Sequence, residues 1–361
     1  MRALLVAGGS GGHLIPALML AEHLNQFHAS CSILSTSRPV DRLVAGDSSF
    51  PWITVDLERF SPFRRWIWPP YLVRQLKAFR QMEKALSRLQ PDVMIGFGGY
   101  LSAVGLFLAR RAGVPAILHE QNLLPGQANR WLAPFADRVA VSFPETKQYL
   151  SRRAKVEVTG NPIRRNPLID PVRAREYFGF DGERPVLLVM GGSQGSGAIN
   201  RWAVQLWQDR PPVERRRVQI LHLAGLAESS PIEAAYQRLG MSARVFSFLK
   251  EMPIAYTAST LAISRAGATT IAELVEYRLA AILIPYPYAG GHQQANALWM
   301  DRQGGAMVIQ EGELLGKRLW EAIEPLLSDL QRLDRMRAAL SARANGSAAQ
   351  RLGELVKQVA G

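Results

Sequence analysis

The chain has 361 residues, of which 48% are hydrophobic and 20% charged, and a formal net charge of +13. Its length is large for one domain and comfortable for two, and its composition is that of a globular protein with an ample core. A single cysteine, Cys31, excludes an internal disulfide and fits a reducing compartment, and no run of about 18 uncharged apolar residues is available to span a bilayer. Residues 1–6 have the charged tip of a signal peptide, but glycines end the apolar run too early, so we expect a first strand there.

Strand and helix patterns alternate through the first half, which predicts a parallel sheet covered by helices on both faces. The expected strands there are residues 3–7, 32–35, 93–97, 116–119, 138–141 and 156–158. A turn-rich segment is typical of a linker, and the second half then restarts with expected strands at residues 186–190, 218–223, 243–246, 261–264, 281–285 and 306–309. We therefore predict an α/β protein with domains at 1–163 and 164–340, and a C-terminal helix within 341–361 that could pack back on the first domain.

One motif occurs twice: a short apolar strand, a glycine-rich turn and the start of a helix. The first turn is Gly8-Gly9-Ser10-Gly11-Gly12, and the second is Gly191-Gly192-Ser193-Gln194-Gly195. Glycines let backbone N–H groups approach an anion, and the helix N-terminus adds a partial positive charge. Each turn alone also fits a tight connection that binds nothing. The pair predicts two domains that each present a phosphate-sized site to a shared cleft.

His13 follows the first turn directly, near the start of the expected helix. The helix dipole disfavours imidazolium there, so the ring should stay neutral and either accept a proton or donate to a phosphate. Two more polar turns follow expected strands, Gly98-Gly99-Tyr100 and His119-Glu120-Gln121-Asn122. Because ligands lie beyond the carboxyl ends of parallel strands, we expect these turns and His13 on one rim. The alternative for the second turn is a polar network that satisfies itself.

In the second half, a turn of small residues leads into a helix that carries Thr270 and Glu273. Their spacing fits a capping box, but an acidic residue here also fits a site that accepts both hydroxyls of a ribose. Further along, Gln293 and Asn296 are spaced i, i+3 and are expected on one helix face, where amides suit sugar hydroxyls.

Over half of the net charge lies within residues 59–88, where eight basic residues stand against one acidic residue. Aromatic side chains are interleaved with them, and an apolar spacing predicts an amphipathic helix. Such a stretch fits nucleic acid, a membrane face, or a solvated helix whose apolar stripe packs on the core. Trp and Tyr favour the headgroup level and basic residues attract anionic lipid, so we favour a membrane surface over nucleic acid.

No Asp-x-Asp pair occurs, and the six histidines lack the spacing of metal ligands. A metal-assisted departure of a diphosphate is therefore not expected. Helix N-termini and an arginine would carry the leaving-group charge instead, with Arg164 in the linker as the candidate.

In this order and combination, the motifs resemble those of the bacterial peptidoglycan N-acetylglucosaminyltransferases of the MurG family, which convert lipid I to lipid II. The resemblance runs from Leu4 to about Gly305 and is carried by both glycine turns, Gly98-Gly99-Tyr100, His119–Asn122, Gly160-Asn161-Pro162-x-Arg164 and His292-Gln293-x-x-Asn296-Ala297. It implies the GT-B architecture, two Rossmann-like domains with parallel sheets facing a central cleft. It also implies a metal-independent, inverting transfer from UDP-N-acetylglucosamine without a cofactor. The acceptor would be an undecaprenyl-diphosphate-linked muramoyl-peptide at the cytoplasmic face of the bacterial cell membrane, where the protein would be peripheral and other cell-wall enzymes are possible partners.

The resemblance further implies roles for individual residues. The donor side would comprise Arg164, Ser193, Gln194, Leu249, Ala268, Thr269, Thr270, Glu273, Gln293, Gln294 and Asn296. The cleft and acceptor side would comprise Ser10, Gly11, Gly12, Tyr100 and Asn122, and the membrane face Trp66, Ile67, Trp68, Tyr71 and Arg74. The muramoyl C4 hydroxyl would attack the anomeric carbon as UDP leaves, with His13 as the first choice of base and Glu120 as the second.

Three stretches depart from the family pattern: Ala266 replaces a usual serine, Glu276-Tyr277-Arg278 replaces small residues, and Gly290-Gly291 stands where an acidic residue is common. Three other functions remain open on the sequence. One is a transferase acting on another membrane lipid, such as diacylglycerol. Another is an oxidoreductase, which would need an acidic residue after the second strand, where Arg38 stands. The last is a basic, non-enzymatic scaffold at the membrane.

Overall fold

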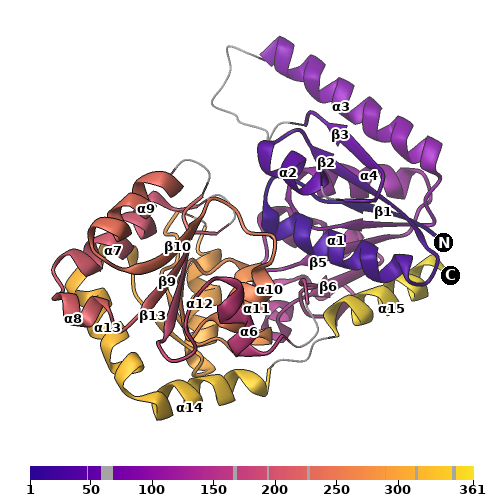
Figure 1. Ribbon diagram of the computed structural model, residues 1–361. Helices are drawn as coiled ribbons and strands as arrows, with labels where there is room; N and C mark the ends of the chain where they lie inside the picture. Colours follow the sequence, from indigo (N-terminus) through magenta and orange to yellow (C-terminus); the bar gives the residue numbers. More distant parts are fainter. Residues whose placement is uncertain are drawn as a thin grey trace. The chain divides into compact units, whose positions relative to one another are not determined.

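The computed structural model describes residues 1–46, 48–57, 68–165, 169–192, 195–225, 228–288, 290–313, 316–343 and 347–361. They form two units, one of Met1–Ile163 with Ser347–Gly361 and the other of Arg164–Gly346 (Figure 1). Each unit is built on a parallel sheet with helices packed against it.

In the first unit, the described residues form seven parallel strands in the order β3-β2-β1-β4-β5-β6-β7. The chain order reverses between β1 and β4, and loops diverge beyond the carboxyl ends of strands at such a point. The glycine turns at 8–12 and 98–99 directly follow these two strands. The strands are β1 (Arg2–Val6), β2 (Ser30–Thr36), β3 (Trp52–Val55), β4 (Val93–Gly96), β5 (Ala116–Glu120), β6 (Arg138–Val141) and β7 (Val156–Val158).

Both faces of this sheet are buried, and successive side chains of a strand alternate between them. Leu5 and Ile33 pack with α1 and α15, whereas Leu4 and Leu34 pack with α3 and α4. Double burial explains why central strands such as β1 and β4 are largely apolar in the sequence. The helices of the unit are α1 (Gly11–Asn25), α2 (Pro39–Ala45), α3 (Trp68–Leu89), α4 (Gly99–Arg111), α5 (Gln127–Leu132), α15 (Ala348–Ala360) and the short η2 (Ala133–Phe135) and η3 (Pro144–Tyr149).

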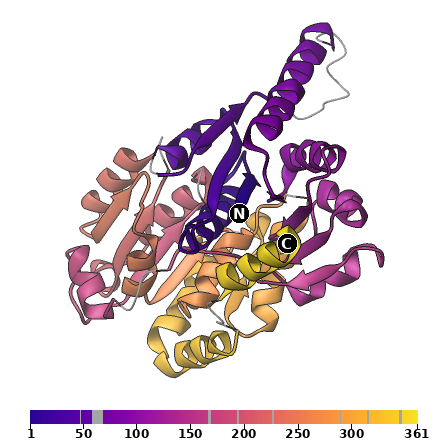
Figure 2. The same cartoon turned by 90° about the vertical axis from the view of Figure 1, so that its right-hand side faces the viewer.

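The last helix, α15, returns to the first unit and lies beside α1 (Figure 1). Gly353 permits the close contact, since a Cβ there would lie 2.6 Å from Cδ2 of His23. Arg351 holds the helix start, because its Nε and Nη2 donate to the carbonyl of Thr159 at 2.9 and 2.7 Å. Both chain ends therefore lie on the same unit and close to each other, as Figure 2 also shows.

The second unit repeats the plan with a sheet of order β10-β9-β8-β11-β12-β13, again parallel throughout among the described residues. Its order reverses between β8 and β11. One face packs on α7, α9, α13 and α14 through residues such as Val189, Ile220 and Trp207. The strands are β8 (Val186–Met190), β9 (Gln219–Leu223), β10 (Ser242–Phe246), β11 (Leu261–Ser264), β12 (Ala281–Leu283) and β13 (Ala306–Val308). The helices are α6 (Pro171–Tyr177), α7 (Gly197–Gln208), α8 (Pro212–Arg215), α9 (Ser229–Arg238), α10 (Met252–Ala258), α11 (Ala268–Glu276), α12 (His292–Arg302), η4 (Glu311–Glu313), α13 (Gly316–Ser328) and α14 (Leu330–Ser341).

The predicted α/β class with two parallel sheets is confirmed, and every predicted strand is present with its ends shifted by at most two residues. The sequence analysis missed β3, a short strand at the edge of the first sheet. Its residues are partly exposed except for Val55, so it lacks the unbroken apolar run of the central strands. Among the helices that the structure describes, none has the length and apolar character needed to cross a membrane.

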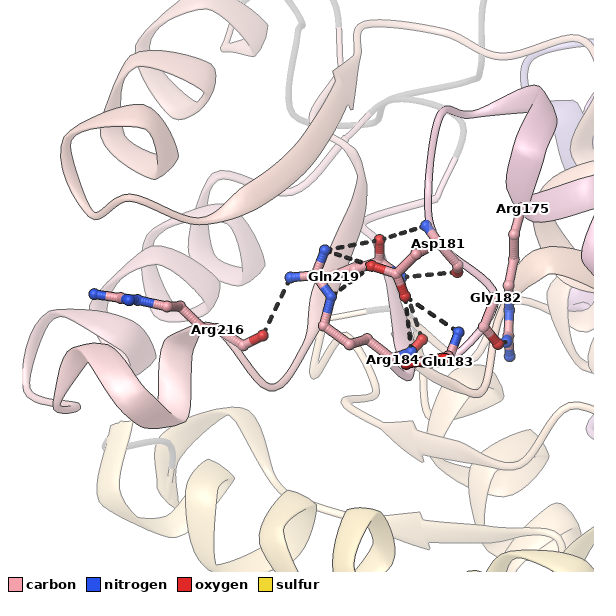
Figure 3. Close-up of polar contacts among 7 residues, drawn as sticks. All are labelled: Arg175, Asp181, Gly182, Glu183, Arg184, Arg216 and Gln219. Atoms are coloured by element: carbon pink, nitrogen blue, oxygen red, sulfur yellow. Dashed lines mark hydrogen bonds and ion pairs between the residues drawn. The ribbon is translucent and has the colours of Figure 1, made fainter.

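A buried glutamine, Gln219, holds the turn at the amino-terminal ends of β8 and β9 (Figure 3). Gln219 is fully buried; its Oε1 accepts the backbone N–H of Asp181 at 3.0 Å, and its Nε2 donates to the carbonyls of Asp181 and Arg184, each at 3.2 Å. The Asp181 carboxylate in turn accepts backbone N–H groups of Glu183 and Arg184, which, with the Arg184 side chain, keep the pKa of Asp181 below its usual range. One side chain thus provides the hydrogen bonds of the turn that enters β8.

We expect Gln219→Leu to lower the free energy of unfolding by about 1–3 kcal/mol, because it leaves partly buried backbone groups without their hydrogen-bond partner. Urea unfolding of the full chain measures this. Arg216→Ala is the matched control, since Arg216 contributes its carbonyl to the same network and its side chain is exposed. Equal unfolding free energies for Gln219→Leu and the wild type would contradict the prediction.

Candidate active site

The first glycine turn is held from below by a buried carboxylate that the sequence analysis missed. Asp41 is 1% exposed and accepts the backbone N–H groups of Gly9 and Thr36, each at 3.0 Å, and the Thr36 hydroxyl. The packing requires glycine, because a Cβ on Gly8 would lie 3.0 Å from the Thr36 nitrogen. Only long-range pairing reveals this role, since Asp41 has no neighbouring motif in the sequence.

His13 lies in the first turn of α1 with one ring nitrogen fixed by the backbone. Its Nδ1 is 3.2 Å from the carbonyl oxygen of Gly8. A carbonyl only accepts, so Nδ1 carries the proton of the neutral ring and Nε2 carries the lone pair. Nε2 faces the second glycine turn, where a Cβ on Gly98 would lie 3.2 Å from it and the backbone φ is +101°. Glycine at 98 therefore leaves room at the basic nitrogen.

His119, at the end of β5, is a structural histidine. It is fully buried; its Nε2 donates to the carbonyl of Gly160 at 3.0 Å, and its Nδ1 accepts from Nε2 of Gln121 at 3.0 Å. Burial lowers the pKa of His119 to about 4, so the ring is neutral near pH 7. His119 thus fixes both the strand end and the chain segment that precedes the boundary between the units.

Glu120 is also buried, and both of its carboxylate oxygens are used. Oε1 accepts the backbone N–H of Asn122 at 2.9 Å, and Oε2 accepts the N–H of Gly126 and Nδ2 of Asn129, each at 2.9 Å. The alternative of a self-satisfied polar network therefore describes these side chains well. The geometry gives Glu120 the task of shaping the loop rather than of moving a proton. Asn129, which the sequence analysis missed, joins this loop to α5.

The other predicted residues of the first unit lie on the same rim. Ser10 precedes α1 without capping it through its side chain, and Gly11 and Gly12 form the first helical turn. Tyr100 lies in the first turn of α4 and is exposed. Ser10, Gly12 and Tyr100 are thus accessible around His13 and the turn at 98–99.

In the second unit, the turn after β8 is even tighter. A Cβ on Gly191 would lie 2.2 Å from the Ser196 nitrogen, and one on Gly195 would lie 2.7 Å from the Ala224 carbonyl oxygen. The Ser196 side chain caps α7 by accepting from Ile199. Ser193 and Gln194, both predicted to bind the donor, lie outside the described residues.

A buried polar chain fixes the helix that follows this turn. His222 is fully buried, with Nδ1 2.9 Å from the Tyr236 hydroxyl and Nε2 3.0 Å from Oδ1 of Asn200. Nδ2 of Asn200 donates to the Ala224 carbonyl at 2.8 Å and to Glu228. Burial lowers the pKa of His222 to about 3, so its imidazole ring in this hydrogen-bond network is neutral near pH 7.

Arg265, at the end of β11, was not singled out from the sequence. It is 6% exposed and donates to Glu311 at 2.6 Å, to the Ile284 carbonyl at 3.2 Å and to the Ser196 hydroxyl at 3.0 Å. Its guanidinium carbon lies 5.3 Å from the ring centroid of Tyr286. A single buried cation therefore links the turns that follow the central strands.

The helix α11 begins at Ala268, with Gly267 as its N-cap. Thr269 and Thr270 lie in its first turn, and no side chain caps it. The capping-box interpretation of Thr270 and Glu273 is wrong, because Thr270 is inside the helix rather than at its N-cap. Glu273 instead accepts a hydrogen bond from the Tyr256 hydroxyl at 2.7 Å.

Burial perturbs the Glu273 carboxyl strongly. Burial raises its pKa to about 7, against the opposing effects of the Tyr256 hydrogen bond and the Arg164 charge. Arg164 itself donates from Nη1 to the Lys250 carbonyl at 3.3 Å, beside the buried Leu249. The structure thus brings Arg164, Glu273 and the segment around Leu249 together, as expected.

Two side-chain amides of α12, the helix predicted to bind the sugar, form hydrogen bonds to the backbone of neighbouring turns. Oε1 of Gln293 accepts the backbone N–H groups of Ala266 and Tyr286 at 3.3 and 3.0 Å, and Nδ2 of the fully buried Asn296 donates to the Ala266 carbonyl at 3.1 Å. Asn296 therefore supports the 264–267 turn from the core, which disfavours direct contact with a ligand. Gln294 is partly exposed.

The basic stretch folds in part as α3, whose apolar residues divide between two faces. Met82 and Leu86 pack on the core, whereas Leu72, Val73 and Leu76 are 53%, 51% and 56% exposed. We call the exposed set, with Phe107 of α4, the α3–α4 patch; Phe79 connects its two parts through a ring contact of 6.1 Å to Phe107. Exposed Arg74, Lys77 and Arg80 lie on the same helix. Among the predicted membrane residues, Tyr71 is half-buried, Trp66 and Ile67 lie outside the described residues, and so does the side chain of Trp68.

Two family models match the chain. The glycosyltransferase family 28 N-terminal domain matches residues 3–141, and the glycosyltransferase family 28 C-terminal domain matches residues 186–352. The chain belongs to glycosyltransferase family 28, in the MurG group. Its fold is accordingly the GT-B fold, to which each unit contributes one Rossmann-like domain.

Relatives of known name cover the whole chain. A protein of Syntrophotalea carbinolica named UDP-N-acetylglucosamine--N-acetylmuramyl-(pentapeptide) pyrophosphoryl-undecaprenol N-acetylglucosamine transferase is 36% identical, over 100% of this chain and 99% of its own. A protein of the same name from Caldanaerobacter subterraneus is 33% identical over 99% and 100%. The crystal structure of Acinetobacter baumannii MurG matches with a TM-score of 0.75 at 27% identity, over 99% of each chain.

No group of three or more histidine, cysteine, aspartate or glutamate side chains lies close enough to hold a metal ion in the described part of the chain. In the second unit, the charge of Arg164 lies close to Glu273 of α11, and Arg265 contacts Ser196, the N-cap residue of α7.

The raised pKa of Glu273 predicts a pH-dependent stability. The folded chain holds this proton more tightly than the unfolded chain, whose value is near 4.5, so the contribution of Glu273 is full below about pH 4.5 and is lost as the pH rises through about 7. We expect unliganded wild type to lose stability relative to Glu273→Gln between about pH 5 and pH 8. Urea unfolding at both pH values measures the difference, and a constant difference would contradict the assignment.

Proposed function

We propose that this protein transfers N-acetylglucosamine from UDP-N-acetylglucosamine to the C4 hydroxyl of the muramoyl sugar of lipid I, giving lipid II. The observation that carries this is full-length identity of 31–36% to curated proteins that are named for this transfer. The geometry of both units supports it, because one unit offers a basic nitrogen and the other offers groups suited to a nucleotide.

The second unit holds the donor. Backbone N–H groups of the 191–195 turn, with Ser193 and Gln194, bind the diphosphate at the N-terminus of α7, and the start of α11 at Ala268, Thr269 and Thr270 adds a second helix dipole. Arg164 lies beside Glu273, so its guanidinium balances the phosphate charge at the ribose end of the nucleotide. Glu273 accepts the ribose hydroxyls, and Leu249 contacts uracil.

The sugar lies near α12. Because Oε1 of Gln293 is used by backbone N–H groups, its amide nitrogen is the group that reaches a sugar hydroxyl. Gln294 is accessible beside it. Asn296 acts indirectly, by holding the turn that Gln293 also contacts.

The first unit holds the acceptor. His13 takes the proton of the muramoyl C4 hydroxyl on Nε2 while the oxygen forms its bond to the anomeric carbon. The bond from that carbon to the β-phosphate oxygen breaks from the opposite face, and its electron pair leaves with UDP. Ser10, Gly11 and Gly12 bind the acceptor diphosphate at the start of α1, and Tyr100 and Asn122 complete the rim.

Neither a metal nor an organic cofactor is part of this proposal. The charge that develops on UDP is stabilised by pre-oriented backbone N–H groups and Arg164, which need no reorganisation during the reaction. Glu120 is the weaker candidate for the base, because its lone pairs already accept three N–H groups at 2.9 Å.

A pair of variants tests the division of roles. His13→Ala should lower kcat by about 10²–10⁴-fold with the Kd for UDP unchanged, because general-base catalysis is lost. Glu273→Gln should instead raise the Kd for UDP by roughly 10- to 100-fold, because it weakens charge-assisted hydrogen bonds.

Radiolabelled UDP-N-acetylglucosamine, offered with polyprenyl-diphosphoryl muramoyl-peptides or with diacylglycerol, measures transfer, and calorimetry measures UDP binding. Transfer to diacylglycerol alone would overturn the acceptor assignment. Loss of UDP binding in His13→Ala would overturn its place on the acceptor side.

The protein works at the cytoplasmic face of the cell membrane as a peripheral protein, through the α3–α4 patch. Exposed leucines and phenylalanine enter the interface while arginines and lysines meet anionic headgroups, each basic residue contributing about 1 kcal/mol. This arrangement brings the rim around His13 to a lipid-borne acceptor.

Vesicle binding tests this surface. Leu72→Ser with Leu76→Ser should weaken partitioning onto phosphatidylglycerol vesicles by tenfold or more, at roughly 1.5–3 kcal/mol per buried leucine. Val213→Ser is the matched control, since Val213 is 69% exposed on α8 of the second unit. Unchanged partitioning of the double variant in a folded protein would exclude the α3–α4 patch.

A further inference from the structure

The residues that open the second unit are fastened to the end of α11. The Arg165 side chain forms an ion pair with Glu276, with Nε 2.8 Å from Oε1. The next residue on the helix, Tyr277, donates its hydroxyl to the Arg164 carbonyl at 3.4 Å. Two consecutive linker residues are therefore held by two consecutive residues of one helix end.

The same helix end also contacts the carboxylate that faces the nucleotide. The ring of Tyr277 stacks on Tyr256, with centroids 5.3 Å apart and planes at 20°, and the Tyr256 hydroxyl donates to Glu273 at 2.7 Å. Tyr277 follows Glu273 by four residues, so both lie on one face of the helix. A continuous set of contacts thus joins the linker backbone, two stacked rings and Glu273.

The side-chain chemistry at positions 276 and 277 makes these contacts possible. A side chain as small as alanine could form neither the ion pair of Glu276 nor the stack of Tyr277. Arg278 adopts φ +51°, a left-handed conformation that ends the helix directly after Tyr277. Glu276 and Tyr277 therefore form a contact surface at the helix end.

We propose that Glu276 and Tyr277 are positioning residues of the donor site, which hold Arg164 and Glu273 in their binding arrangement before the nucleotide arrives. The inference rests on the proposed role of the second unit in holding UDP. Ordering a flexible segment when the ligand binds costs affinity. Contacts that fix the backbone at Arg164 and Arg165 beforehand remove part of this cost and so strengthen binding. The guanidinium is held as well, by the Lys250 carbonyl at 3.3 Å.

The experiment measures UDP affinity and donor kinetics of the full chain. Tyr277→Ala removes both the stack and the hydroxyl, and we expect it to raise the Kd for UDP and the KM for UDP-N-acetylglucosamine by roughly 3- to 30-fold. Because the reacting groups are untouched, kcat should stay within about twofold. Tyr277→Phe keeps the stack and loses only a long hydrogen bond, so it should restore affinity to within about threefold of wild type.

The ion pair is tested separately by charge exchange. Glu276→Arg should raise the Kd for UDP several-fold, and the double variant Arg165→Glu with Glu276→Arg should restore most of the loss. Glu157→Gln is the matched control, since it breaks an ion pair of similar length, 3.0 Å to Arg138, in the first unit. Its UDP affinity should equal that of the wild type.

Two results would overturn the inference: UDP affinity within twofold of wild type in both Tyr277→Ala and Glu276→Arg, or a fall in kcat with KM unchanged. If Tyr277→Ala does not fold, as judged by its thermal melt, the charge-exchange series decides alone. Failure of the proposed donor site is distinguishable, because Glu273→Gln would then also bind UDP as well as the wild type does.

Discussion

In both units the chain passes from the first strand of the unit into a helix within a few residues. The glycine that follows each of these strands lies very close to another backbone segment. A Cβ on Gly191 would come within 2.2 Å of the Ser196 nitrogen, and one on Gly8 within 3.0 Å of the Thr36 nitrogen. A Cβ at position 191 would force the backbone to shift, and one at position 8 would make an unusually tight contact. The same closeness that requires glycine exposes backbone N–H groups at a helix N-terminus, which is what an anionic ligand needs.

Such turns have little to stabilise them from within, and buried polar side chains supply the missing hydrogen bonds. Asp41 holds the 8–12 turn, Glu120 holds the 121–126 loop, and Arg265 links the turns of the second unit. Each of these groups is satisfied by backbone or by an opposite charge, as burial of a polar group demands. The loops that follow the central strands therefore depend on buried polar side chains for their hydrogen bonds.

The sequence predicted the fold well because a parallel sheet with both faces covered has a simple signature. The strand at 186–190 is apolar throughout, for example, and Gly191 marks its end. The edge strand at 52–55 was missed because its residues other than Val55 are partly or fully exposed, so it lacks an unbroken apolar run.

The site was predicted less completely, since its supporting contacts join residues far apart in the chain. The pairs Asp41 with Gly9 and Tyr256 with Glu273 leave no local pattern. The capping-box interpretation was wrong for a related reason: spacing alone fits Thr270 and Glu273, but the helix begins earlier, at Ala268.

One geometric distinction separates the residues that support from those suited to chemistry. Both polar atoms of the His119 ring and both carboxylate oxygens of Glu120 form hydrogen bonds within the protein. Their geometry is therefore fixed, and these atoms already have partners. His13 and Gln293 have one polar atom on the backbone and the other directed to no partner in the described part of the chain.

A side chain anchored at one atom is oriented without being saturated, which is the condition for a base or a ligand contact. Glu273 is of this kind too, with Oε2 on Tyr256 and a pKa near 7 that burial maintains. Burial favours the neutral carboxylic acid and a nearby cation favours the carboxylate, and Arg164 lowers the pKa of Glu273 in this way. The linker arginine therefore keeps the neighbouring carboxylate more ionised than burial alone would, and under the proposed function its positive charge also serves the nucleotide.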